Sequence, residues 1–109
     1  MNIWVFWTRV HGENFATTHL TEKGAYLAAI NDILDWYGAR DDPDYFLESL
    51  SERMGNPDDW TAETAPPYLE EDLKKLDSGE LTEVFAQWNE LTWDDYEYEC
   101  DILHTRIQG

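Results

Sequence analysis

Cysteine, positive charge and long apolar runs are all scarce in this sequence. Its 109 residues include a single cysteine, Cys100, which excludes an internal disulfide and a metal site made of several thiolates. No apolar stretch approaches the roughly 20 residues that cross a bilayer as a helix, and the first residues lack a signal-peptide pattern. We therefore expect a reduced, cytoplasmic protein with no membrane segment.

The shortage of positive charge is the strongest compositional feature. Seven Lys and Arg stand against 24 Asp and Glu, a formal net charge of −17. Residues 1–40 carry a net −1 of this and residues 41–109 a net −16. Such a surface repels nucleic acid and anionic membranes, so we expect no direct binding to either and favour a basic protein as partner. Solubility alone, or adaptation to high salt, would explain the charge without a partner.

Catalytic motifs are lacking as well. The histidines His11, His19 and His104 include no i, i+4 pair of the kind that binds zinc on a helix. There is no glycine-rich phosphate loop and no serine elbow. Cys100 and His104 would share one face of a strand roughly 13 Å apart, so Cys100 is expected in the core and not as a nucleophile. We expect no catalytic residue; a small enzyme using His11 or His19 is the alternative from another class.

Three acidic clusters have the right residue type for cation binding but the wrong spacing. A calcium loop needs oxygen ligands at alternating positions, a glycine at the sixth and a glutamate at the twelfth. The clusters in residues 41–44, 58–59 and 94–95 supply no such set. We therefore expect no metal and no cofactor.

Apolar residues, by contrast, are sufficient for one core. Hydrophobic residues make up 42% of the chain and aromatic residues 15%, which argues against disorder despite the charge. The sequence contains no repeat, no low-complexity tract and no linker. At this length it predicts a single domain over residues 1–109.

The first part of the chain predicts a hairpin followed by a helix. Residues 3–10 are rich in β-branched and aromatic side chains, residues 11–14 form a turn, and residues 15–19 return as a second strand. Thr21 is a good N-cap and Gly38 a good stop for the amphipathic helix between them.

Further helical patterns fill the middle of the chain. A stripe of apolar residues predicts one helix from Asp42 to Gly55, and another pattern covers Pro67 to Leu76. Ser78 is taken as the cap of a last helix that contains Trp88. Among the tryptophans, Trp7 and Trp88 fit core positions.

The C-terminal stretch has the alternation of a strand with one buried and one wet face. Tyr98 and Cys100 fall on one side, and Glu97, Glu99 and Asp101 on the other. The three carboxylates would stand about 7 Å apart, a coarse match to phosphates along one nucleic-acid strand.

This order of elements predicts an α+β fold. We expect a three-stranded antiparallel sheet, made of the N-terminal hairpin plus the C-terminal strand, with three to four helices inserted between strands 2 and 3 and covering one face. The last strand should pair with the first, because an aromatic-rich strand is a poor exposed edge.

Acidic residues gather in the runs DDPD, PDDW, LEEDL and WDDYEYECD. Trp60 and Trp93 stand beside acidic pairs, where tryptophan is favoured at interfaces, although each could instead fold back onto the core. The predicted partner-binding residues are Asp41, Asp42, Asp44, Asp58, Asp59, Trp60, Glu70, Glu71, Asp72, Trp93, Asp94, Asp95, Glu97, Glu99 and Asp101.

With these runs, its small size and its lack of catalytic motifs, the chain resembles, at the level of class, the small acidic anti-CRISPR and anti-restriction proteins of phages and mobile elements. Many of those proteins look like nucleic acid to their targets. The resemblance implies a stoichiometric inhibitor whose acidic surface blocks a basic nucleic-acid-binding effector, such as a CRISPR effector or another nuclease. The alternative is an immunity protein or antitoxin that neutralises a basic nuclease toxin.

Overall fold

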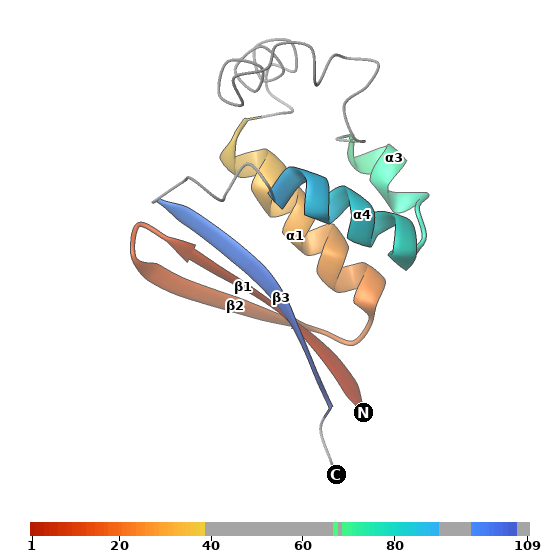
Figure 1. The fold of residues 1–109 in the computed structure, drawn as a ribbon, viewed down its shortest axis with the longest axis horizontal. Coiled ribbons are helices and arrows are strands. Elements are labelled where there is room, and N and C mark those ends of the chain that lie inside the picture. Colours follow the sequence, from red (N-terminus) through yellow and green to blue (C-terminus); the bar gives the residue numbers. More distant parts are fainter. Residues whose placement is uncertain (39–66, 68, 90–96, 107–109) are drawn as a thin grey trace.

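The computed structural model describes residues 1–38, 67, 69–89 and 97–106. In these residues the chain forms two strands, three helices and a last strand (Figure 1). The elements are β1 (Asn2–Val10), β2 (Glu13–His19), α1 (Glu22–Trp36), α3 (Glu70–Lys74), α4 (Ser78–Asn89) and β3 (Tyr98–Arg106). The fold is α+β, as predicted, with the described helices between the second and third strands.

The three strands form one antiparallel sheet in the order β2-β1-β3. The register sets Val10 opposite Glu13 in the hairpin and opposite Tyr98 in β3. The expected pairing of the last strand with the first is therefore confirmed. It places the aromatic-rich β1 in the centre, where both of its edges are hydrogen-bonded.

The hairpin turn is shorter than predicted. Only His11 and Gly12 connect the strands, with φ angles of 51° and 84°. Two consecutive residues with positive φ are typical of a type I′ turn, whose backbone twist matches the twist of the two strands that it connects. Glu13 and Asn14, expected in the turn, belong to β2 instead.

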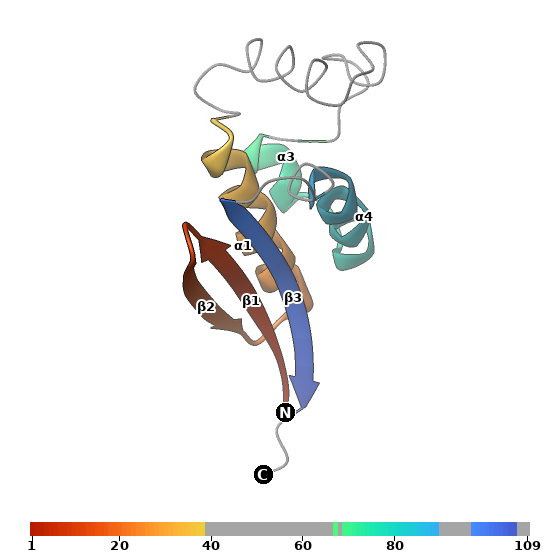
Figure 2. The same cartoon turned by 60° about the vertical axis from the view of Figure 1, so that its left-hand side comes forward.

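The helices lie on one face of the sheet and leave the opposite, outer face uncovered by any described helix (Figure 2). Along β1, Phe6 and Thr8 are buried toward the helices. Because side chains alternate between faces, Trp7 must point outward. It is only partly buried, so its predicted place in the core was wrong, whereas Trp88 is fully buried.

The helix α1 begins and ends where the sequence predicts. Thr21 is its N-cap, and its hydroxyl oxygen accepts a 3.0 Å hydrogen bond from the Gly24 N–H. Gly38 follows the last turn with a φ of 71°, a conformation that glycine adopts without strain. Between them Ile30, Ile33 and Leu34 are fully buried against the sheet and the other helices.

Asp77, and not Ser78, caps α4. The Asp77 carboxylate accepts a 2.8 Å bond from the Glu80 N–H, and the Asp77 N–H donates to the Glu80 side chain at 3.3 Å. This reciprocal pair is a capping box, which satisfies two N–H groups that the helix leaves unpaired. The cap therefore lies one residue earlier than predicted.

The third helical stretch is shorter than its pattern suggested. The sequence predicts a helix over Pro67 to Leu76, but α3 covers five residues. Leu73 is fully buried, while Leu69, expected on the same face, is 48% exposed at the N-cap. Lys23 of α1 donates to the Lys74 carbonyl at 2.9 Å and ties the end of α3 to the first turn of α1.

The core lies between the inner sheet face and the helices. Trp88 is its largest side chain, and the indole N–H donates to the Pro67 carbonyl at 2.9 Å. The buried cluster consists of Phe6, Ala29, Ile30, Ile33, Leu34, Leu73, Leu81, Val84, Phe85, Trp88, Tyr98 and Cys100. The helix predicted for Asp42 to Gly55 lies outside the described residues. None of the described helices is long and apolar enough to cross a membrane.

Candidate functional site: two sheet surfaces

Six of the fifteen predicted partner-binding residues lie in the part of the chain that the structure describes. They occur in two separate places, with Glu70, Glu71 and Asp72 on α3, and Glu97, Glu99 and Asp101 on or just before β3. The other nine lie outside the described residues: Asp41, Asp42, Asp44, Asp58, Asp59, Trp60, Trp93, Asp94 and Asp95.

The alternation predicted for the last strand is confirmed. Tyr98 and Cys100 are buried on the inner face. Glu99 pairs with Arg9 across the register and Asp101 pairs with Trp7, so both acids belong to the outer face. The sequence thus identifies the exposed side of β3 correctly.

The row of three carboxylates is, however, interrupted in the middle. Arg9, on the neighbouring strand, forms a salt bridge with Glu99 on the outer face. Both side chains are about half exposed, so the pair adds little stability, but it brings a positive charge into the row. Arg9 was not among the predicted site residues, because its position opposite Glu99 depends on the register between strands 90 residues apart.

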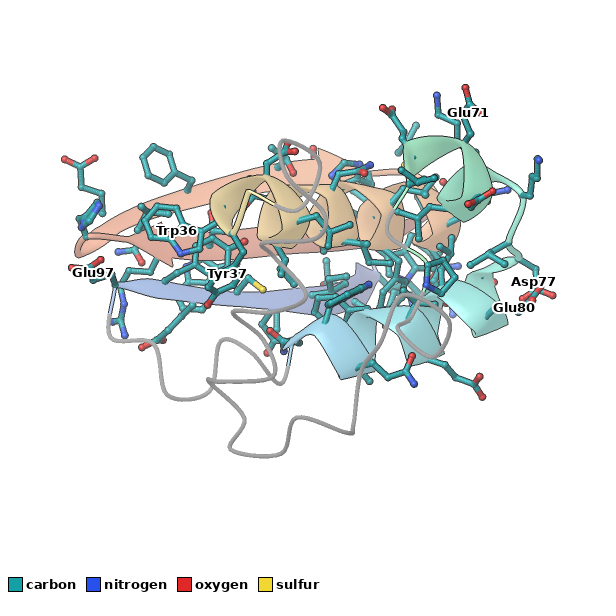
Figure 3. The ribbon with its side chains drawn as sticks, turned by 90° about the horizontal axis from the view of Figure 1, so that it is seen from above. Trp36, Tyr37, Glu71, Asp77, Glu80 and Glu97 are labelled. Atoms are coloured by element: carbon teal, nitrogen blue, oxygen red, sulfur yellow. The ribbon has the colours of Figure 1, made fainter. Side chains whose placement is uncertain are left out.

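The acids of α3 form a second, separate surface. Glu70, Glu71 and Asp72 are exposed, and Glu70 pairs with Lys74 one turn later at 3.4 Å. Figure 3 shows Glu71 toward the same end of the molecule as Asp77 and Glu80 of the capping box, while Glu97 lies toward the opposite end. The predicted acidic residues therefore do not form one continuous described face.

Apolar side chains accompany the acids on the outer sheet face. Leu103 of β3 is 56% exposed and stands opposite Val5 in the register. Ile3, Val5 and Trp7 of β1 share this face by alternation and are partly buried. With Arg9, Glu99 and Asp101 these apolar residues form the central part of the outer face. It combines a modest apolar centre with carboxylates beside it.

The inner side of the hairpin contains a pocket. It has a volume of about 380 Å³ and opens between β1, β2 and α1. Apolar and hydroxyl side chains of the two strands form most of its wall, and Asp32 of α1 contributes a carboxylate. Its lining residues are Phe6, Thr8, Val10, Phe15, Ala16, Thr17 and Asp32.

Asp32 is held in place by a tyrosine from the far strand. The Tyr98 hydroxyl donates to Asp32 Oδ2 at 2.5 Å. Burial of the ring, and then this hydrogen bond to a carboxylate, raise the pKa of the Tyr98 hydroxyl well above its usual value. Tyr98 therefore acts as a permanent donor to Asp32.

Cys100 has the properties of a core residue, as predicted. Its thiol is buried and donates to Asn89 Oδ1 at 3.2 Å. Burial, the largest effect, raises the pKa of the thiol to about 12, which keeps it protonated and a poor nucleophile at neutral pH. His104 is exposed and stacks on Trp4 with ring centroids 4.8 Å apart.

The other two histidines, His11 and His19, each contact a neighbouring side chain. His11 packs edge-on against Trp36 at 5.6 Å, and His19 Nε2 lies 2.8 Å from the Thr17 hydroxyl. Within the described ranges no group of three or more His, Cys, Asp or Glu side chains is arranged to hold a metal ion.

We compared the chain with family models, curated proteins and solved structures, and it matches none of them.

Proposed function

We propose that this protein is a stoichiometric inhibitor that binds the basic, nucleic-acid-binding surface of a defence effector and acts without catalysis. The observation that carries the proposal is the outer face, where Asp101 and Glu99 stand beside the exposed Leu103 on a chain of net charge −17. This face combines acidic and apolar contacts in one exposed area. A basic groove built for phosphates is the complementary surface in charge.

The two kinds of contact have different roles in this proposal. The overall charge attracts a basic target over long range and raises the rate of association. Leu103 and Trp7 supply apolar area, which carries affinity once water is excluded from the interface. Charge thus selects the target, and the apolar centre retains it.

Because of the Arg9–Glu99 pair, the proposed binding does not require the outer face to copy the phosphate spacing of a nucleic acid. A row of carboxylates copying phosphate spacing would need an uninterrupted negative strand, but a guanidinium lies at its centre. The proposal therefore rests on the summed charge and on Asp101, and not on a one-to-one match between carboxylates and phosphates. Arg9 itself offers donors to an acidic residue at the rim of a target.

A charge reversal on the outer face tests this proposal. The tagged protein and its variants are used to capture partners from a host lysate, with washes at low and then high salt, and the affinity for the captured effector is then measured. Asp101→Lys should weaken binding about tenfold by placing a cation against a basic surface. Glu83→Lys on α4 changes the charge equally, away from the sheet, and should cost only about two- to threefold through weaker steering.

Three results would overturn the proposal. The first is no basic partner at either salt concentration. The second is equal loss in the Asp101→Lys and Glu83→Lys proteins, which would leave the outer face without a specific role. The third is a complex unaffected by salt, since the Debye length falls from about 10 Å at 0.1 M to about 3 Å at 1 M and exposed charges must then be screened. A secreted or plasmid-borne nuclease toxin as the partner would favour an immunity protein over an inhibitor of defence.

A further inference from the structure

Among the described strands, none pairs with the outer edge of β2. The order β2-β1-β3 leaves β2 at one border. In a two-residue hairpin Val10 and Glu13 exchange hydrogen bonds, and the direction of the backbone groups alternates from there. The N–H and C=O groups of Asn14, Ala16 and Thr18 must therefore point away from β1. Among the described residues no hydrogen bond to these groups is found.

This edge lacks the charges that commonly protect a free strand. The β3 edge, at the other border, carries Glu99, Asp101 and Arg106. Along β2 the only charged side chain is Glu13, at the end next to the turn, and every residue up to Thr18 is exposed. Charged residues are a common means of keeping edges from pairing with other chains. Of the two border strands in the described sheet, β2 is therefore the one with fewer charges to keep another strand from pairing.

The inner pocket lies directly beside this open edge. Phe15 and Thr17 of β2 face the inner side and line it, and Phe15 is 54% exposed. A strand added along β2 would place every second side chain next to Phe15 and Thr17, at the mouth of the pocket. Side-chain pockets next to a free edge are how proteins that bind an extended peptide select its sequence.

The chemistry of the pocket favours a long cationic side chain. Asp32 Oδ2 accepts the Tyr98 hydrogen bond, and no bond to Oδ1 is found among the described residues. Phe6, Val10 and Phe15 contribute apolar surface to the pocket that Asp32 also lines. A lysine has a matching form, with an apolar stem and an ammonium at its tip. Its stem fits the rings and its ammonium fits Asp32.

We propose that the β2 edge and this pocket together bind an extended, basic segment of a partner protein. The segment pairs with the main chain of Asn14, Ala16 and Thr18 and places a lysine in the pocket against Asp32. A second copy of this chain is a poorer occupant, because β2 contains no lysine or arginine and two chains of net charge −17 repel each other. The proposal goes beyond the proposed function, since it concerns a different surface from the outer face.

A pair of synthetic peptides tests this inference on the full chain. The probe is acetyl-Thr-Val-Thr-Lys-Thr-Val-Thr-amide, and the control replaces its lysine by norleucine, which keeps the stem and removes the charge. In a titration followed by amide NMR, the lysine peptide should shift the signals of residues 13–19 and 32, and should bind about tenfold more tightly than the control. Shifts confined to β3, no shifts at millimolar peptide, or equal affinity for both peptides would overturn the proposal.

Two variants separate the edge from the pocket. Ala16→Pro removes an outward N–H and adds a ring at the edge without breaking a bond to β1, so both peptides should lose binding. Asp32→Asn keeps an acceptor for Tyr98 and should reduce the lysine peptide to the affinity of the norleucine control. If its amide spectrum shows that the Ala16→Pro protein is unfolded, the role of the edge is judged from the amide signals of the natural protein that shift when the peptide binds.

Asp101→Asn is the matched control, because it makes the same chemical change on the outer face. It should leave peptide binding unchanged, and a loss equal to that of Asp32→Asn would contradict a specific pocket. The same variant also distinguishes the two proposals. Loss of effector binding with peptide binding retained supports two separate surfaces, and peptide binding without any basic effector in a lysate overturns the proposed function and leaves this inference standing.

Discussion

The Tyr98 hydroxyl donates a 2.5 Å hydrogen bond to the Asp32 carboxylate, which joins β3 to α1 across 66 positions of sequence. Trp36, one helical turn beyond Asp32, stacks on the same tyrosine ring with centroids 5.3 Å apart. One buried tyrosine thus sets the position of the helix on the sheet. It also holds the carboxylate at the wall of the inner pocket.

Tyr98→Phe should lower the free energy of unfolding by about 1.5–3 kcal/mol. The change removes a hydrogen bond to a charged acceptor and keeps the ring contacts. Tyr26→Phe is the matched control, since Tyr26 packs edge-on against Phe85 and should lose less than about 0.5 kcal/mol. Urea unfolding at pH 7 measures both, and equal losses would mean that the Asp32 bond contributes nothing specific.

Stability should fall in alkaline solution through Cys100 and Tyr98. Burial raises the pKa of the Cys100 thiol to about 12 and raises that of Tyr98 as well, so the folded protein keeps protons that the unfolded chain releases. The contribution of Cys100 to the free energy of unfolding is constant below the unfolded-state thiol pKa of about 8.5. Above that pH the free energy of unfolding falls by up to about 1.4 kcal/mol per pH unit for each of the two groups, and the fall due to Tyr98 begins above about pH 10.

Urea unfolding between pH 7 and 11 checks this profile. Cys100→Ala should remove the decline that starts near the unfolded thiol pKa, and Tyr98→Phe should remove the part that starts near the unfolded phenol pKa. An unfolding free energy that stays level across this range would show that neither group is protected from ionisation in the folded state.

Because Asp77 caps α4, substitutions at Asp77 and at its neighbour Ser78 should have different effects on the free energy of unfolding. Asp77→Ala removes the acceptor for the Glu80 N–H and should cost about 0.5–2 kcal/mol. Ser78→Ala, one residue later, should change stability by less than about 0.5 kcal/mol. Asp77→Asn keeps a capping oxygen without the charge and should lie between them. Thermal or urea unfolding decides the order, and a larger loss at Ser78 would restore it as the cap.

Gly24 should not follow the rule that alanine stabilises a helix. In an open helix the replacement of glycine gains about 0.5–1 kcal/mol. Here a Cβ on residue 24 would lie 2.9 Å from Thr21 Oγ1, the atom that caps the helix. Gly24→Ala should therefore bring no gain, because the clash displaces the cap.

The same substitution should stabilise the helix once the capping oxygen is absent. In a Thr21→Ala background the atom that meets the new Cβ is gone, and Gly24→Ala should recover the usual gain. Unfolding measurements on the two single variants and the double variant form the cycle. Equal effects of Gly24→Ala in both backgrounds would exclude the proposed conflict.

Local pattern was a reliable guide to several elements. The cap at Thr21, the stop at Gly38 and the buried stripe of α1 all follow from residues within one helix. The alternation of Tyr98 and Cys100 with Glu99 and Asp101 separated the two faces of β3 correctly, because a strand has a period of two. Errors of one or two residues arose where neighbours compete for one role, as Asp77 and Ser78 do for the cap.

The sequence by itself determined the α+β order, the outward face of β3 and the excess of negative charge. The tertiary structure decided which side chains meet. It alone placed Arg9 against Glu99, turned Trp7 outward, and set Asp32 between Tyr98 and an open pocket. The physical reason is that periodicity is written within each element, whereas strand register and helix position depend on packing between residues far apart in the chain.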